Sequence, residues 1–178
     1  MTRKKLSLEE LQRATIKDFK SQVKNPIVVV LDNVRSAMNV GSVFRSADAF
    51  ALEQIILTGI TPQPPHKEIN KTAIGATESV AWQYIEDIAS ELKKLQSEGY
   101  IIISIEQTDD SIPLRDYPIK AHDKYVLILG NEVSGVSEEL IDLCDDCIEI
   151  KQFGTKHSLN VSVCAGIVFW AFAKEALQ

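Results

Sequence analysis

The sequence has few cysteines and no cluster of metal ligands, which excludes two common ways of stabilising a small protein. Its 178 residues contain three cysteines, an odd number that does not make a disulfide framework. Cys144 and Cys147 form a C-x-x-C pair, but no second pair or histidine cluster completes a zinc site. We therefore expect structural roles for both cysteines, no metal, and a reducing, cytoplasmic compartment.

Long apolar runs and glycine fingerprints are also missing. The longest apolar stretch, residues 161–173, is shorter than the roughly 20 residues of a membrane span, so no membrane partner is expected. The amino-terminal MTRKKLSLEELQR is charged and contains no apolar signal region. No G-x-G-x-x-G follows the first apolar run, and the G-x-x-x-x-G at residues 130–135 continues with Val136 instead of lysine. These absences argue against a Rossmann-type enzyme and a phosphate-binding loop.

The charge is unevenly distributed along a chain whose length fits one domain, residues 1–178. The net charge of −6 argues against a nucleic-acid partner when taken alone. Residues 1–24, however, carry seven basic and three acidic residues, against 12 and 22 in the remainder. We interpret this segment as a basic helical arm that contacts RNA, a solvated lysine-rich helix being the alternative. The arm residues proposed for RNA contact are Arg3, Lys4, Lys5, Arg13 and Lys17.

Apolar runs alternate with helical patterns. Continuous apolar runs predict strands at residues 26–32, 54–59, 79–85, 100–105, 125–130 and 147–150. Helices are expected after a cap at Asn39 and over residues 86–97, 137–144 and 158–176, with Ser158 as the last cap. Residues 61–67 and 107–124 are expected to be loops. This order predicts an α/β fold, a parallel sheet with helices on both faces.

Polar residues gather in three segments that follow predicted strands, where ligands bind in open parallel sheets. Glu132 lies in GNEVSGVSEEL after the strand at 125–130, and its simplest role is to cap the following turn. Arg45 lies in a small, apolar helix, where pairing with Asp48 on the surface is the simplest interpretation. Asn160 follows Ser158 in the segment KQFGTKHSLN and could bond a loop or a ligand.

Together these segments resemble the three motifs of the SpoU/TrmH family of RNA ribose 2′-O-methyltransferases, in the SPOUT superfamily. The motifs correspond here to Asn39-x-Gly41-x-x-x-Arg45-Ser46-Ala47, to Leu129-Gly130-Asn131-Glu132-x-x-Gly135, and to Ile150, Gly154 and residues 158–163. KTAIGATESV, residues 71–80, resembles the family's segment between the first two motifs. Two positions depart from the pattern: Lys151-Gln152 replaces Pro-Met, and Val133 replaces a glycine. Both could weaken the binding of the cofactor.

The resemblance implies a trefoil knot in the carboxyl-terminal half, a homodimer whose active site is completed across the interface, and S-adenosylmethionine as cofactor. The apolar last helix is expected to contribute to that interface. By this resemblance Arg45 matches the residue that acts on the 2′-hydroxyl. A guanidinium is a poor base, so we expect Arg45 to bind the adjacent RNA phosphate and to stabilise negative charge on the 2′-oxygen. The other residues that the resemblance assigns to catalysis are Asn39, Glu132, Ser158 and Asn160. Of these, Glu132, Ser158 and Asn160 are expected to orient Arg45 and the ribose. Those that the resemblance assigns to the cofactor are Glu106, Gly130, Asn131, Ile150, Ser158 and Leu159.

Transfer RNA and ribosomal RNA are both consistent with these motifs. The sequence shows no separate RNA-binding domain, which favours a compact target such as transfer RNA. A protein of the same fold that binds RNA or cofactor without methylating remains an alternative, as does methylation of a base. The Asn-Glu and Ser-Leu-Asn signatures favour ribose.

Overall fold

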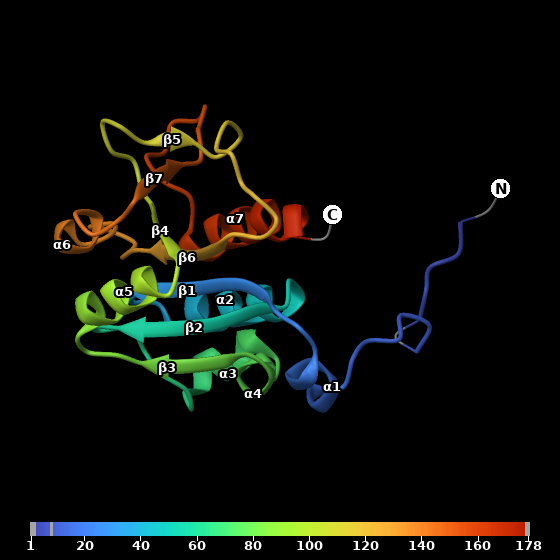
Figure 1. Cartoon of the computed structure of the whole chain (residues 1–178). Coiled ribbons are helices and arrows are strands. Elements are labelled where there is room, and N and C mark those ends of the chain that lie inside the picture. Colours follow the sequence, from blue (N-terminus) through green and yellow to red (C-terminus); the bar gives the residue numbers. More distant parts are fainter. Residues whose placement is uncertain (1–2, 8, 177–178) are drawn as a thin grey trace.

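The computed structural model describes residues 3–7 and 9–176 and has a central parallel sheet of seven strands. The strands follow the order β3-β2-β1-β6-β4-β7-β5 (Figure 1). The element bounds are β1 Asn25–Asp32, β2 Leu52–Thr58, β3 Ala81–Tyr84, β4 Tyr100–Ile105, β5 Ile112–Pro113, β6 Lys124–Leu129 and β7 Asp146–Glu149. All the pairings between these strands are parallel, as predicted.

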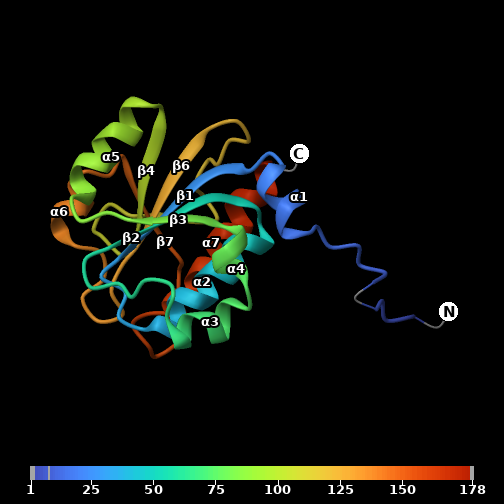
Figure 2. The ribbon, with the colours of Figure 1, turned by 90° about the horizontal axis from the view of Figure 1, so that it is seen from below.

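Helices cover both faces of the sheet, which confirms the predicted fold class. Figure 2 shows α2, α3, α4 and α7 on one face and α5 and α6 on the other. Side chains alternate along the strands: Val29 and Leu31 of β1 pack toward α2 and α7, whereas Val28 and Val30 pack toward α5 and α6. The helices are α1 Ile16–Ser21, α2 Ala37–Ala49, α3 Lys67–Ala73, α4 Ala76–Ser79, α5 Ile88–Ser97, α6 Glu138–Ile141 and α7 Val161–Ala176.

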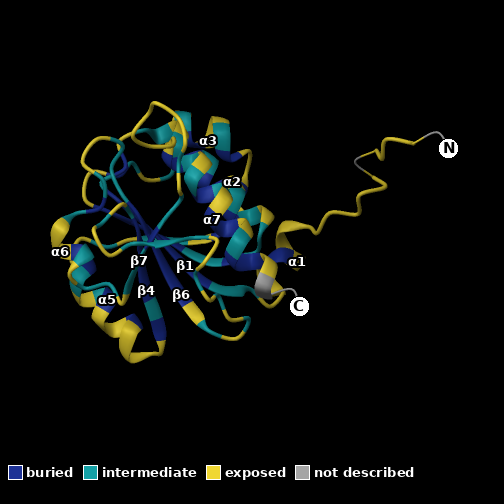
Figure 3. Cartoon of the chain, turned by 90° about the horizontal axis from the view of Figure 1, so that it is seen from above, coloured by how far each residue is buried: buried dark blue, intermediate teal, exposed yellow. Residues whose placement is uncertain are grey.

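The core is nearly continuous across the central strands, as the dark ribbons of Figure 3 show. Val29, Val30 and Leu31 are fully buried, which is why their run contains no polar residue. No helix among the described residues is long and apolar enough to cross a membrane.

Two predicted helix caps are wrong by a few residues. Ser36, not Asn39, caps α2, since its hydroxyl accepts a hydrogen bond from the Asn39 N–H at 3.3 Å. Asn160, not Ser158, caps α7, because its Oδ1 accepts from the N–H groups of Ser162 at 2.9 Å and Val163 at 3.4 Å. The side-chain oxygen of Asn39 is therefore not used to cap α2, whereas that of Asn160 is used to cap α7.

The basic arm is helical only over Ile16–Ser21, so the prediction of a helical arm fails for the rest of its described part. Residues 3–7 and 9–15 run away from the body (Figure 1), and this segment buries no side chain that could offset the cost of ordering a helix. Residues 1, 2 and 8 of the predicted arm lie outside the described residues. Phe19 of α1 is 7% exposed and attaches the arm to the core.

Candidate functional site

The site lies where β6, β4 and β7 end, because neighbouring parallel strands end at the same edge of the sheet. Leu31 of β1 pairs with Leu129 of β6, and Ile105 of β4 pairs with Ile148 of β7. The loops that follow, residues 130–137 and 150–160, border a cavity of about 490 Å³ together with Glu106 and Gln107. Gly130, Asn131, Glu132, Ile150, Ser158 and Leu159, all predicted for the site, line the same cavity.

The loop at residues 130–137 depends on two glycines. A Cβ on Gly130 would meet the backbone of Gly135 at 2.1 Å, so no side chain fits there. Gly135 has φ of +73°, and a Cβ on it would meet the Glu106 carboxylate at 2.1 Å. The main chain of the loop can therefore approach a ligand and the Glu106 side chain closely.

Asn131 shapes this loop with its whole side chain. Its Oδ1 accepts hydrogen bonds from the N–H groups of Val133 at 2.8 Å and Ser134 at 3.1 Å. Its Nδ2 donates to the Asn33 carbonyl at 2.7 Å. Asn131 thus borders the cavity, but its amide is already occupied in forming the loop. The unexpected Val133 is 81% exposed and fits into the turn through its backbone.

Glu132 connects this loop to the start of α2. Its carboxylate accepts from the N–H groups of Arg35 at 2.9 Å and Ser36 at 3.1 Å, and from Nδ2 of Asn39 at 2.9 Å. Burial alone raises the pKa of Glu132, but these hydrogen bonds outweigh it and leave the pKa below the ordinary value of 4.5. The carboxylate is therefore charged near neutral pH and serves as an acceptor, not as a base that exchanges protons.

Asn39 extends the connection to the third motif. Its Oδ1 accepts from Nδ2 of Asn160 at 3.1 Å, so a chain of side chains runs from Glu132 through Asn39 to Asn160. One residue from each motif takes part, across 93 and 121 residues of sequence. The structure brings these three together, and Ser158 lines the neighbouring cavity.

Arg45 does not join this network. It lies in α2 beyond Asn39, and its side chain borders a second hollow with Arg13 of the arm. Within the described part of the chain no hydrogen bond or ion pair involves Arg45, and Asp48, its suggested partner, accepts from the Ser79 hydroxyl instead. The expectation that Glu132, Ser158 and Asn160 orient Arg45 is not met by any contact within one chain.

Sequence reasoning missed two residues that hold the site together. Asp32, 2% exposed at the end of β1, accepts from the Ser137 N–H at 2.8 Å and from the Ser137 hydroxyl, and so fixes the far end of the loop. Gln107 donates to the carbonyl of His157 at 3.0 Å and joins the segment that follows β4 to the loop at residues 150–160. A carboxylate at the end of a buried strand was the signal for Asp32.

Cys164 of α7 also borders the cavity, but as a packing residue. Burial, with a smaller contribution from Glu106, raises the pKa of its thiol to about 11. The thiol is therefore protonated near neutral pH and a poor nucleophile. Among the described residues no group of histidine, cysteine and carboxylate side chains could hold a metal.

The cavity fits S-adenosylmethionine. Leu129, Ile148, Ile150 and Leu159 supply apolar walls for an adenine ring, and the carboxylate-rich side suits a cation. The carboxyl ends of the strands are where open parallel α/β sheets usually bind ligands such as nucleotide cofactors.

The comparisons identify the family. Residues 26–170 match the model of the SpoU rRNA Methylase family, and the chain belongs to this family. It is 30% identical over 171 residues to the 23S rRNA (guanosine-2′-O-)-methyltransferase RlmB of Vibrio parahaemolyticus, covering 95% of this chain and 67% of that protein. The corresponding Escherichia coli protein is 28% identical over 167 residues, which cover 93% of this chain and 67% of that protein.

Solved structures agree with the family. The AdoMet-bound rRNA methyltransferase from Sinorhizobium meliloti superposes with a TM-score of 0.80 at 25% identity, covering 94% of this chain and 62% of that chain. The A. aeolicus TrmH/SpoU tRNA modifying enzyme also superposes with a TM-score of 0.80, at 23% identity, covering 90% of this chain and 80% of that chain. It shows that the two chains share a fold. The chain is thus an S-adenosylmethionine-dependent RNA ribose 2′-O-methyltransferase, as the motifs predicted, and the family implies the trefoil knot.

Proposed function

We propose that this chain methylates the 2′-hydroxyl of a guanosine in ribosomal RNA. The observation that carries the proposal is the Glu132–Asn39–Asn160 chain, which joins all three family motifs at the edge of the cofactor cavity. The RlmB relatives named above support ribosomal RNA and guanosine. Transfer RNA, which the sequence favoured, is named for two similar structures that are 23% and 18% identical to this chain. A ribosomal substrate also agrees with the predicted cytoplasmic location.

The cofactor supplies an electrophilic methyl group, and the protein supplies position and charge. The backbone around Gly130, Ile150 and Leu159 would hold the adenosine part, with Glu106 bracing the loop through the Val136 N–H at 3.0 Å. Asn39 and Asn160 would hold the ribose side of the site in register with the cavity. Correct placement of two reacting groups can supply much of a rate enhancement.

Arg45 would act on the RNA. A guanidinium can bind a phosphate through two parallel N–H bonds and stabilise negative charge that develops on the 2′-oxygen. A guanidinium stays protonated at physiological pH and is therefore unsuited to remove the proton itself. Arg3, Lys4, Lys5, Arg13 and Lys17 of the arm are all exposed and would add attraction for phosphates at longer range.

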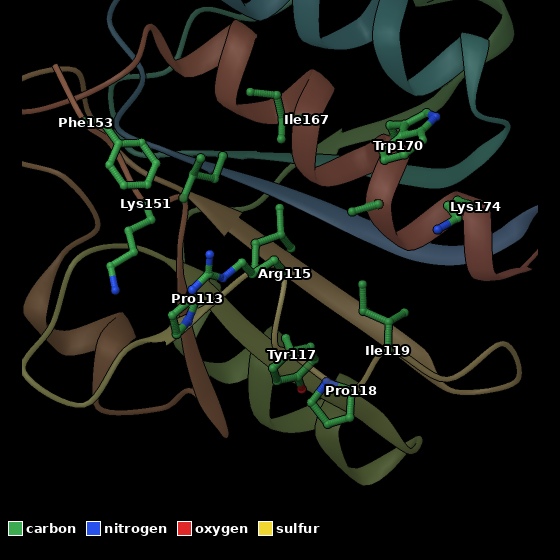
Figure 4. A pocket seen from close by; sticks show the side chains of 13 residues that line it. Pro113, Arg115, Tyr117, Pro118, Ile119, Lys151, Phe153, Ile167, Trp170 and Lys174 are labelled. Atoms are coloured by element: carbon green, nitrogen blue, oxygen red, sulfur yellow. The ribbon is translucent and has the colours of Figure 1, made fainter.

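A second copy of the chain would complete this site, because Arg45 has no partner from the Glu132 network within one chain. The face of α7 offers an interface: Trp170 is 57% exposed, Val163 52% and Ile167 39%. Trp170 and Ile167 border a hollow of about 570 Å³ that Phe153 and Tyr117 also line. Figure 4 shows these side chains around the hollow. Apolar surface of this kind on a folded chain marks a site of association. We propose a homodimer through this face.

The test is transfer of labelled methyl groups from S-adenosylmethionine to unmodified ribosomal RNA and, separately, to transfer RNA, with Arg45→Ala as the control. We expect label on guanosine O2′ in ribosomal RNA, and loss of that label in the variant. Label confined to transfer RNA would overturn the substrate. Cofactor binding without label in either pool would support the silent binding protein.

A further inference from the structure

The segment at residues 71–80, which resembles the family pattern, has no part in the cofactor cavity. It folds as the end of α3, a turn at Ile74–Gly75, and α4. Two hollows lie on either side of this turn, and Gly75 borders both. One, of about 650 Å³, contains Arg45; the other, of about 400 Å³, contains Trp82. The segment is therefore the wall between Arg45 and a neighbouring hollow.

The Trp82 hollow combines flat apolar surfaces with free polar groups. Pro64 and Pro65 of the preceding loop line it together with the indole of Trp82, which lies on the edge strand β3. The ring of Trp82 is held edge-on against Phe44, with centroids 6.4 Å apart. Asn70 and Glu78 also line the hollow, and no side chain in the described ranges bonds to theirs. An amide and a carboxylate beside an aromatic ring are the groups that proteins use to recognise an unpaired base.

The turn itself is strained and exposed. Ile74 has φ of +49°, a conformation that is unfavourable for a β-branched residue, yet its side chain is 67% exposed and gains little from packing. The left-handed residue ends α3, where its N–H donates to the Asn70 carbonyl at 3.2 Å, and its side chain borders the Arg45 hollow. The adjoining Gly75 borders both hollows, so the turn separates them by a single residue.

The hollow is held rigidly against the helix that carries Arg45. A Cβ on Gly41 of α2 would meet Thr72 at 2.1 Å and the Ile69 carbonyl at 2.3 Å, so α2 and α3 pack at their closest approach there. The Thr72 hydroxyl donates to the carbonyl of Met38 at 2.9 Å. The spacing between Arg45 and the Trp82 hollow is thus set by packed helices.

We propose that this hollow binds a guanine base of the substrate RNA while Arg45, across the Ile74–Gly75 turn, binds its sugar–phosphate part. The proposal rests on the function proposed above and adds the site that selects the base. Guanine presents two adjacent donors, N1–H and N2–H, which a carboxylate such as Glu78 can accept in parallel, and its ring can stack on Trp82. Adenine, cytosine and uracil lack that pair of adjacent donors.

The test follows the indole N–H signals of Trp82 and Trp170 by NMR during titration with GMP, AMP, CMP and UMP; Trp82→Phe identifies the first signal. We expect GMP to shift the Trp82 signal and leave that of Trp170 in place. Glu78→Gln should weaken the binding of GMP about tenfold, which is the effect of losing a hydrogen bond to a charged group. The binding of AMP should not change. Glu98→Gln, which removes the same charge at the end of α5, is the matched control and should change neither.

Equal shifts with all four nucleotides, no shift at saturating GMP, or equal effects of Glu78→Gln and Glu98→Gln would overturn the guanine site. Methyl transfer by the unaltered protein, measured in parallel, keeps the two proposals apart. Transfer to ribosomal RNA without a GMP-specific shift leaves the proposed function standing and removes the base site. A GMP-specific shift without methyl transfer leaves the guanine site standing and removes the proposed function.

Discussion

The side-chain amide of Asn160 donates to the side-chain oxygen of Asn39 at 3.1 Å, and Asn39 in turn donates to Glu132 at 2.9 Å. The bond joins the cap of α7 to the first turn of α2. Asn39 is thus the only one of the three that touches both others, and its amide works as a donor on one side and an acceptor on the other.

Asn39→Ala should lower kcat/KM for RNA about tenfold, because it leaves Glu132 and Asn160 without the bond that sets their spacing. Steady-state methyl transfer measures the effect. Asn25→Ala is the control, since the Asn25 amide also donates to a residue distant in sequence, the Phe50 carbonyl at 2.6 Å, but at the start of β1 and outside the site. An equal loss of activity in both variants would mean that the effect is general destabilisation.

Asp32→Asn should weaken cofactor binding about tenfold while kcat at saturating cofactor changes little. The change replaces one carboxylate oxygen by an NH2 group, so the side chain can no longer accept from both Ser137 and Asn33, and its hold on the end of the cofactor loop weakens. Isothermal calorimetry with S-adenosylhomocysteine measures the affinity.

Asp145→Asn is the matched control for Asp32, because Asp145 accepts from the Ile102 N–H and from Gln96 Nε2, both at 2.8 Å, and does not line the cavity. It should lower the melting temperature without changing the cofactor affinity. If the affinity falls in step with stability in both variants, Asp32 has no specific role in the loop.

Arg45→Lys should reduce transfer about 100-fold with cofactor affinity unchanged, since an ammonium group keeps the charge but not the two parallel N–H donors. Single-turnover transfer to ribosomal RNA is the measurement. Turnover near that of the unaltered protein would exclude the forked contact.

Glu132 should contribute to stability in a pH-dependent way. Its pKa is lowered in the folded chain, so its contribution is fully present above the ordinary value of 4.5 and is lost as the pH falls through the lower folded value. The difference in unfolding free energy between the unaltered protein and Glu132→Gln should therefore shrink as the pH is lowered from about 7 toward 3. A difference that stays constant over this range would show that the charge on Glu132 is not stabilised in the fold.

Trp170→Asp should dissociate the proposed dimer and reduce transfer, since it places a charge in the apolar face of α7. Sedimentation velocity gives the mass. Val23→Asp alters a side chain that is 95% exposed outside that face and should leave the mass unchanged. A single-chain mass for the unaltered protein would refute the interface directly.

The strands could be predicted because a strand buried on both faces of the sheet has a continuous apolar run, as the fully buried Val29 and Val30 show. The short helices α3 and α4 could not be predicted, since their sequence KEINKTAIGATES has little helical periodicity. Their packing against α2 stabilises them instead. The site residues were found by resemblance, whereas their contacts were not: Glu132 and Asn39 are 93 residues apart, and no local pattern encodes that pairing. Arg45 was expected to be oriented by Glu132, Ser158 and Asn160, but among the described residues of one chain no hydrogen bond or ion pair joins it to them.

The side chain of Asn131 makes three hydrogen bonds within the protein, so the loop that borders the cofactor cavity takes its shape before any ligand arrives. A preorganised loop loses little conformational entropy on binding. The backbone of residues 130–137 should therefore move by less than about 1 Å between the free and the cofactor-bound protein. The affinity for the cofactor would then depend on how well the preformed loop fits the cofactor, and not on the ordering of the loop.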